Sequence, residues 1–90
     1  MKVVKKDGRI ENFDISKVMT TIARASDDAN TPLTSSDVEN LSEDVRDNIV
    51  TNYKDPVHVI QIRDAVIREL QKLGFRSIAS VYDTGKVERR

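Results

Sequence analysis

The chain has 90 residues, with 15 basic and 15 acidic side chains and no cysteine. This composition predicts one domain with a single modest core, and it excludes disulfides, thiolate metal sites and a cysteine nucleophile. No apolar run approaches the roughly 18 residues of a membrane span, and the charged N-terminus differs from a signal peptide, so we expect a cytoplasmic protein.

Charge is unevenly distributed along the chain. Residues 1–17 carry five basic and three acidic side chains, whereas residues 27–55 carry eight acidic and two basic ones. The balance turns positive again after Pro56 and ends in Lys86, Arg89 and Arg90. A compact anionic ligand near the termini fits this pattern. Because nucleic-acid-binding domains are usually basic overall, we expect no nucleic-acid partner.

The first predicted element is a β-hairpin over residues 2–13. Two short strand-like runs flank Asp7-Gly8, a dipeptide that supplies the positive φ of a type I′ turn. With a two-residue loop, Lys5 and Ile10 would share one face of the hairpin. A longer loop would change these pairs, so the register stays open.

Four helices are predicted after the hairpin, over residues 15–29, 36–52, 60–73 and 75–83. Asp14 is the expected N-cap of the first helix, and Ser36 with Glu39 forms a capping box for the second. Gly74 is expected just beyond the end of the third helix. Apolar residues at helical spacing define the expected core: Ile15, Val18, Met19, Ile22, Ala23, Val38, Leu41, Val45, Ile49, Ile62, Val66, Leu70, Leu73, Phe75, Ile78, Ala79 and Tyr82.

Residues 57–59 are rich in β-branched side chains and are expected to add a third strand to the hairpin. The predicted fold class is therefore α+β, with one domain over residues 1–90. In this domain a small bundle of about four helices is capped by a short three-stranded antiparallel sheet.

The residue types that most catalytic and metal sites require are missing or isolated. The three glycines lie far apart, so they form neither a P-loop nor a dinucleotide-binding fingerprint. His58 has no second ligand at metal spacing, and we interpret it as structural. Acid pairs such as Asp27-Asp28 fall on predicted solvent-facing turns. We therefore expect a binding protein without enzymatic activity and without a metal site.

The informative cluster lies between residues 3 and 17. A phosphate chain needs several converging cations, and Lys5, Lys6 and Lys17 supply them at short range in place of a glycine loop. Asp14 lies beside the positive end of the first helix, where an anion is favoured. Glu11 can accept a hydrogen bond from a base amino group or a ribose hydroxyl. The same charges would also suit a hairpin that is merely well solvated.

These residues resemble a known family. Val3-x-Lys5-Lys6-Asp7-Gly8 is followed by Phe13-Asp14-x-x-Lys17, and later by Ile-Arg-Asp-Ala-Val-Ile over 62–67 and Ala-Ser-Val-Tyr over 79–82. This order of motifs is similar to that of the ATP-cone, the nucleotide-binding regulatory domain at the N-terminus of many ribonucleotide reductases. The domain also occurs in the zinc-ribbon repressor of bacterial reductase genes. The resemblance covers nearly the whole chain.

The resemblance implies allosteric regulation of deoxyribonucleotide metabolism by ATP, with dATP as competitor and usually with magnesium. It implies four helices covered by a three-stranded sheet, with the nucleotide between them. The partners it implies are an adenine nucleotide, a catalytic or regulatory protein, and further copies of the chain. Its implied site comprises Val3 at the base, Lys5, Lys6 and Lys17 at phosphates, Asp7 and Gly8 in the turn, Glu11 at the base or sugar, and Asp14 beside the site.

Three positions depart from the family pattern. Lys6 stands where arginine is commoner, and Val59 stands where a serine or threonine often precedes the third helix, which predicts the loss of a cap. Asp83 stands where arginine is frequent, with Lys86 as a substitute cation. These departures leave open a degenerate cone that acts as a protein adaptor or transcriptional accessory protein. The start at Met1, directly before the motif, favours a free-standing or N-terminal domain over the repressor.

Overall fold

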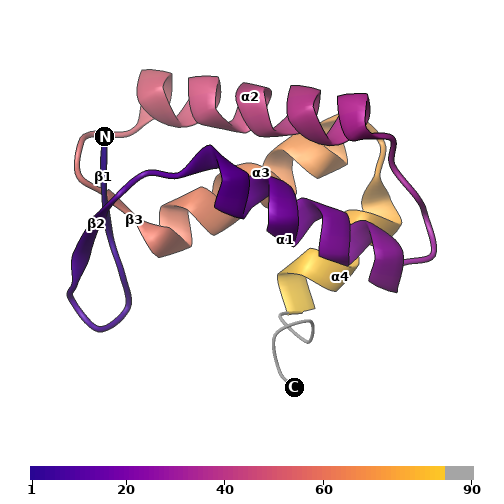
Figure 1. Cartoon of the computed structure of the whole chain (residues 1–90), viewed down its shortest axis with the longest axis horizontal. Helices are drawn as coiled ribbons and strands as arrows, with labels where there is room; N and C mark the ends of the chain where they lie inside the picture. Colours follow the sequence, from indigo (N-terminus) through magenta and orange to yellow (C-terminus); the bar gives the residue numbers. More distant parts are fainter. Residues whose placement is uncertain (85–90) are drawn as a thin grey trace.

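The computed structural model describes residues 1–84. It contains four helices and three strands, so the predicted α+β class is confirmed (Figure 1). The elements in chain order are β1 (Lys2–Val4), β2 (Ile10–Asn12), α1 (Ile15–Asp28), α2 (Ser35–Asn52), β3 (Val57–His58), α3 (Val59–Lys72) and α4 (Arg76–Thr84).

The sheet is mixed, which corrects the antiparallel sheet expected from the sequence. Its strand order is β2-β1-β3, with β2 antiparallel and β3 parallel to β1. The backbone N–H of Lys2 donates to Asp55 Oδ1 at 2.8 Å, which joins the start of β1 to the loop before β3. Both strands therefore begin at the same end of the sheet. The sequence identified the third strand but not its direction.

The hairpin closes through a three-residue loop and not through the expected type I′ turn. Lys5 N–H donates to the Arg9 carbonyl at 2.8 Å, and Gly8 N–H donates to the Lys5 carbonyl at 2.9 Å. Gly8 has φ of 90°, whereas Asp7 is not among the residues with positive φ. A single left-handed glycine after a tight turn is the usual three-residue hairpin solution. Lys5 consequently lies opposite Arg9, and Ile10 lies opposite Val4.

The helix starts are set by side-chain caps, two of which differ from the sequence expectation. The predicted Asp14 cap of α1 is confirmed. Thr34 and Asp37 form the capping box of α2, in place of the predicted Ser36 and Glu39. His58 Nδ1 accepts from Ile60 N–H at 3.1 Å and caps α3, so Val59 does not cost this helix its cap. This contact agrees with the structural interpretation of His58.

Two helices end in the same hydrogen-bonded motif. Beyond α3, Gly74 has φ of 88°, and Phe75 N–H donates to the Leu70 carbonyl at 2.8 Å, as the sequence predicted for a glycine at this position. Asn30 plays the equivalent part beyond α1, with φ of 54°. Asparagine tolerates this conformation better than most residues do, so α1 stops cleanly before Pro32.

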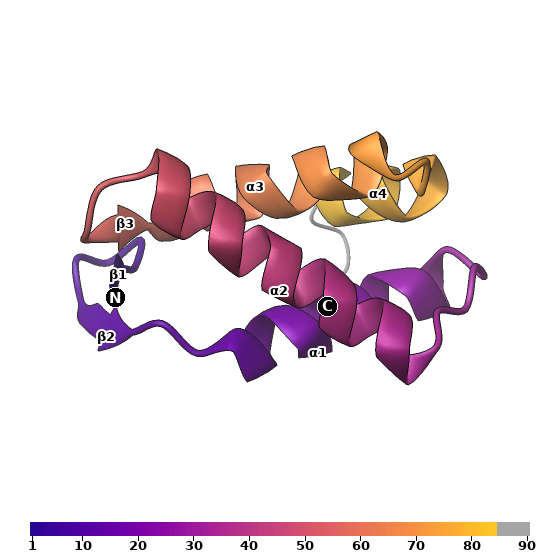
Figure 2. The same ribbon diagram turned by 90° about the horizontal axis from the view of Figure 1, so that it is seen from above.

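The helices pack as a ring around one core. α1 and α3 are connected mainly through α2 and α4, and α2 crosses over both (Figures 1 and 2). The fully enclosed large side chains are Ile22, Ile49, Leu70, Ile78, Val45, Val57 and Val66. Leu73, expected in the core, is 49% exposed because α3 ends just before it. Within residues 1–84, no helix has the length and apolar character needed to cross a bilayer.

Candidate functional site

A cavity of about 720 Å³ lies between the hairpin and the helices. Its walls come from the sheet, the part of α1 from Lys17 to Arg24, the beginning of α3 and the end of α4. Because α1 and α3 are bridged by other helices, space remains between them beside the sheet. The volume falls within the usual range of small-molecule sites, roughly 300–1,000 Å³.

The sheet face determines which hairpin residues reach the cavity. Val3 is directly opposite Glu11, and side chains on a strand alternate between faces, so Lys5 follows Val3 on the same side. All three line the cavity. Val3 is 7% exposed and also belongs to the core, which makes it both a packing and a lining residue.

One face of α1 supplies the opposite wall. Lys17, Thr21 and Arg24 recur at intervals of four and three residues, so they lie on consecutive turns of the same face, and all of them line the cavity. α1 begins beside the hairpin because Asp14 accepts from Ser16 N–H at 3.0 Å and Ser16 Oγ at 2.6 Å. Lys17 therefore reaches back toward the sheet.

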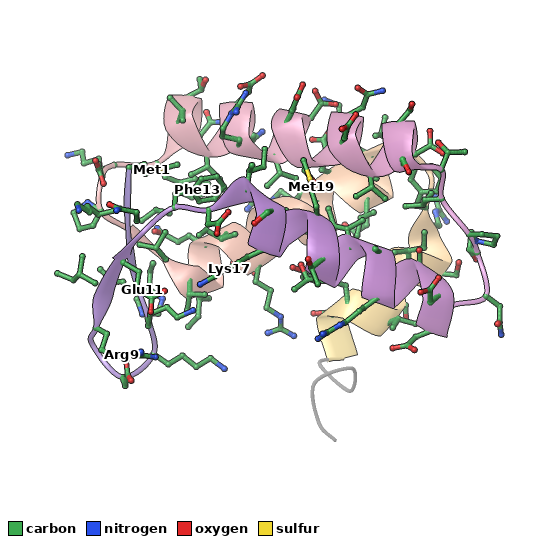
Figure 3. The ribbon with its side chains drawn as sticks, in the orientation of Figure 1. Met1, Arg9, Glu11, Phe13, Lys17 and Met19 are labelled. Atoms are coloured by element: carbon green, nitrogen blue, oxygen red, sulfur yellow. The ribbon has the colours of Figure 1, made fainter. Side chains whose placement is uncertain are left out.

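Glu11 on β2 forms ion pairs with cations of both the hairpin and α1. Its Oε1 lies 3.5 Å from Lys17 Nζ and 4.0 Å from Lys5 Nζ, and its Oε2 lies 3.5 Å from Arg9 Nη1. Figure 3 shows the Lys17 side chain extending from α1 toward Glu11 on the hairpin. One carboxylate thus gathers cations from both sides of the cavity. Lys5 and Lys17 are brought together, as expected from the sequence.

Further cations line the cavity without such pairing. The Lys6 and Arg24 side chains form no hydrogen bond or ion pair with residues 1–84. Asp14 is the second acid in the lining. Hydrogen bonds from the Ser16 hydroxyl and backbone, together with the charge of Lys17, hold the pKa of Asp14 below its ordinary value. Five cationic side chains therefore face two carboxylates: Lys5, Lys6, Lys17, Arg24 and Arg63 against Glu11 and Asp14.

The end of α4 is tied to both neighbouring helices. Arg63 on α3 donates to the Asp83 carbonyl and lies 3.9 Å from its carboxylate. The hydroxyls of Thr21 and Tyr82 are 3.0 Å apart. Position 83 therefore supplies no cation of its own, and Asp83 instead holds Arg63 at the cavity. Lys86, the expected substitute, lies outside the described residues.

Apart from Thr21, the remaining lining is apolar or aromatic, and a flat aromatic ring could pack there: Val3, Phe13, Val18, Val59, Ile60, Ile62 and the ring of Tyr82. Val59 lines the cavity with an apolar side chain at the position where the family often has a serine or threonine hydroxyl. The cavity thus has an apolar wall beside a cationic one.

Six of the eight site residues expected from the sequence line the cavity: Val3, Lys5, Lys6, Glu11, Asp14 and Lys17. Asp7 and Gly8 do not. They form the hairpin loop, where Asp7 Oδ2 accepts from Arg9 Nε at 2.7 Å. Sequence reasoning missed Thr21, Arg24 and Arg63. The helical spacing from Lys17 could have identified the first two, whereas Arg63 requires knowledge of how α3 meets the sheet.

Comparison with known proteins identifies the family of the chain. The family model described as the ATP cone domain matches residues 1–83. The chain is 32% identical over 87 residues to "Transcriptional repressor NrdR" of Streptococcus uberis. Proteins of the same name from Streptococcus equi subsp. zooepidemicus and Streptococcus pyogenes serotype M5 are 31% and 30% identical over 87 residues. Each alignment covers 93% of this chain and 52% of the relative.

The chain belongs to the ATP-cone domain family. It spans about half the length of the curated relatives it matches. These relatives are transcriptional repressors by name, so the expectation that favoured a free-standing or N-terminal domain over the repressor finds no support. For the same reason, the expectation that nucleic acid is not a partner finds no support.

Proposed function

We propose that this chain is a nucleotide-sensing regulatory domain that binds ATP or dATP in the cavity between its hairpin and helices. The observation that carries the proposal is the convergence of Lys5, Lys6 and Lys17 beside an apolar wall in one cavity. A nucleoside triphosphate has the same two-part character, with a flat apolar base and a chain of negative charges.

The lysines are the proposed phosphate ligands. Their ammonium groups form charge-assisted hydrogen bonds with phosphate oxygens, and such bonds are roughly twice as strong as neutral ones. Glu11 holds two of these lysines within 4.0 Å in the free protein. An incoming phosphate would replace Glu11 as their partner. Glu11 would then be available to a base amino group or a ribose hydroxyl.

The apolar wall is the proposed base site. Val3 and Phe13 come from the sheet and the segment after it, and Val59 comes from the start of α3. Aliphatic and aromatic side chains can enclose an adenine ring and strip it of water. Thr21 and Tyr82 hydroxyls lie in the same cavity and offer polar contacts at its edge.

Magnesium fits this site only as part of the nucleotide. Residues 1–84 contain no cluster of three or more acidic or histidine side chains that would hold a metal ion. Of the two cavity carboxylates, Glu11 already faces cations, and Asp14 accepts from Ser16. Magnesium usually retains several waters and is held largely by substrate phosphates. The ion would therefore enter bound to the triphosphate.

The regulatory part of the proposal rests on the family and on its repressor relatives. We propose that nucleotide occupancy alters how this domain contacts a protein partner, within the regulation of ribonucleotide reduction. Binding, not catalysis, is the proposed activity, and the roles proposed for Glu11 and Asp14 are to hold the lysines and to cap α1. A degenerate cone without nucleotide sensing remains the alternative outcome.

Isothermal titration calorimetry with ATP, dATP and GTP tests the proposal. Adenine nucleotides should bind, and Lys5→Ala/Lys17→Ala should abolish the heat. The matched control is Lys54→Ala/Lys72→Ala, which removes two lysines that do not line the cavity and should bind normally. Absence of heat with every nucleotide would support the adaptor alternative and overturn the proposal.

A further inference from the structure

The outer edge of β2 is an open strand edge. Among the helices and strands, only β1 packs substantially against β2, and Figures 1 and 2 show β2 at the outer side of the sheet. The Arg9 carbonyl accepts from Lys5, so the Ile10 N–H in the same peptide unit points away from β1. Along a strand, a residue's N–H and C=O point to the same side, so both Ile10 groups face outward.

The sequence of this edge is complementary to itself. Arg9, Ile10 and Glu11 place a cation and an anion on either side of an apolar residue. If two such strands pair antiparallel with Ile10 opposite Ile10, each Arg9 faces the Glu11 of the other copy. The outward groups of Ile10 are those that such a pair would exchange.

The side chain of Ile10 gives this edge an apolar centre. It is 63% exposed, the highest value among the large exposed apolar residues of the described chain. Ile10 lies opposite Val4 on the sheet face that Val3 and Glu11 do not share. Natural proteins protect such edges with short strands, charged side chains, above all lysine, or proline; β2 is short and carries the charge of Glu11, but it contains neither lysine nor proline.

We propose that β2 is a self-association surface at which two copies of this chain pair edge to edge, forming one continuous six-stranded sheet across a two-fold axis. The occupant is a second copy because the charge pattern that the edge presents is its own complement. The strand is only three residues long, so the dimer is weak and forms only at high protein concentration. This inference does not depend on nucleotide binding.

Sedimentation velocity of the whole chain without nucleotide, over increasing concentration up to about 1 mM, is the first test. The wild type should show a monomer–dimer equilibrium. Ile10→Lys places like charges opposite each other and should weaken dimerisation about tenfold or more. Val50→Lys is the matched control, since Val50 is 62% exposed on α2, and it should leave the equilibrium unchanged.

Charge reversal tests the register. Arg9→Glu alone and Glu11→Arg alone each set like charges opposite one another and should be monomeric, with circular dichroism confirming the fold. Mixed in equal amounts, these two variants should form a heterodimer, because every cross-strand pair is then opposite in sign. A monomeric wild type overturns the proposal, as does an association that Ile10→Lys leaves intact. If Glu11→Arg does not fold, the comparison of Ile10→Lys with Val50→Lys still decides.

Discussion

Removing the charge of Glu11 tests the electrostatic core of the site. In Glu11→Gln, the carboxylate that lies within 4.0 Å of Lys5, Arg9 and Lys17 becomes neutral, and these cations then repel each other. The lysine side chains are 31% and 66% exposed and Glu11 is 34% exposed, so solvent screens each pair. Partly exposed pairs contribute roughly 0.2–1 kcal/mol each.

The three pairs together predict a loss of about 1 kcal/mol in the free energy of unfolding, since glutamine retains some hydrogen bonding. For a domain of this size, that loss lowers the Tm by about 4–8 °C. Urea denaturation in low salt measures the difference, and Glu39→Gln on α2 is the control because Glu39 forms no ion pair with residues 1–84.

Salt dependence separates charge from packing. The Debye length shrinks from about 10 Å at 0.1 M salt to about 3 Å at 1 M, so the stability difference should largely disappear in 1 M sodium chloride. A double-mutant cycle with Lys17→Met should give a favourable coupling of a few tenths of a kcal/mol or more. A Glu11→Gln variant as stable as the wild type in low salt would refute this description of the cluster.

Three further predictions concern the fold. Ser42→Ala should raise the free energy of unfolding by about 1 kcal/mol in urea titration, because the buried Ser42 hydroxyl has no partner, and a loss of stability would contradict this. Thr34→Ala should cost about 1 kcal/mol, whereas Ser36→Ala should cost only a few tenths, and equal losses would reject Thr34 as the cap of α2. Asp14 has a lowered pKa in the folded state, so its contribution is complete above the ordinary value of 3.8 and is lost as pH falls through the folded pKa. Wild-type stability should therefore fall more steeply than that of Asp14→Asn as the pH falls below the ordinary value of 3.8, and parallel acid profiles would exclude this contribution.

Local signals predicted most of the helical structure. Asp14 and Gly74 act at the ends of their helices as the sequence indicated, because capping depends on a few neighbouring residues. The start of α2 was harder, since Thr34 and Ser36 are each followed three residues later by an acid. Both pairs have the sequence of a capping box, and only the packing of the loop after α1 selects Thr34.

Features that depend on the path of the chain could not be predicted. β3 runs parallel to β1 because α2 returns the chain to the end of the sheet where β1 begins. The β-branched residues Val57 and Val59, of which the second begins α3, carry no information on strand direction. By contrast, Lys5 and Lys17 are close enough in the sequence for their convergence on one site to be predicted. Arg63 reaches the same cavity only through the placement of α3 beside the sheet.

Chemical-shift mapping of backbone amides during a titration with ATP tests the central claim most directly. The account predicts that the largest shifts cluster at Lys5, Glu11 and Lys17, with further changes at the start of α3 and little change along the outer face of α2. Shifts that centre on α2, or a spectrum that ATP leaves unchanged, would contradict a nucleotide site between the hairpin and the helices.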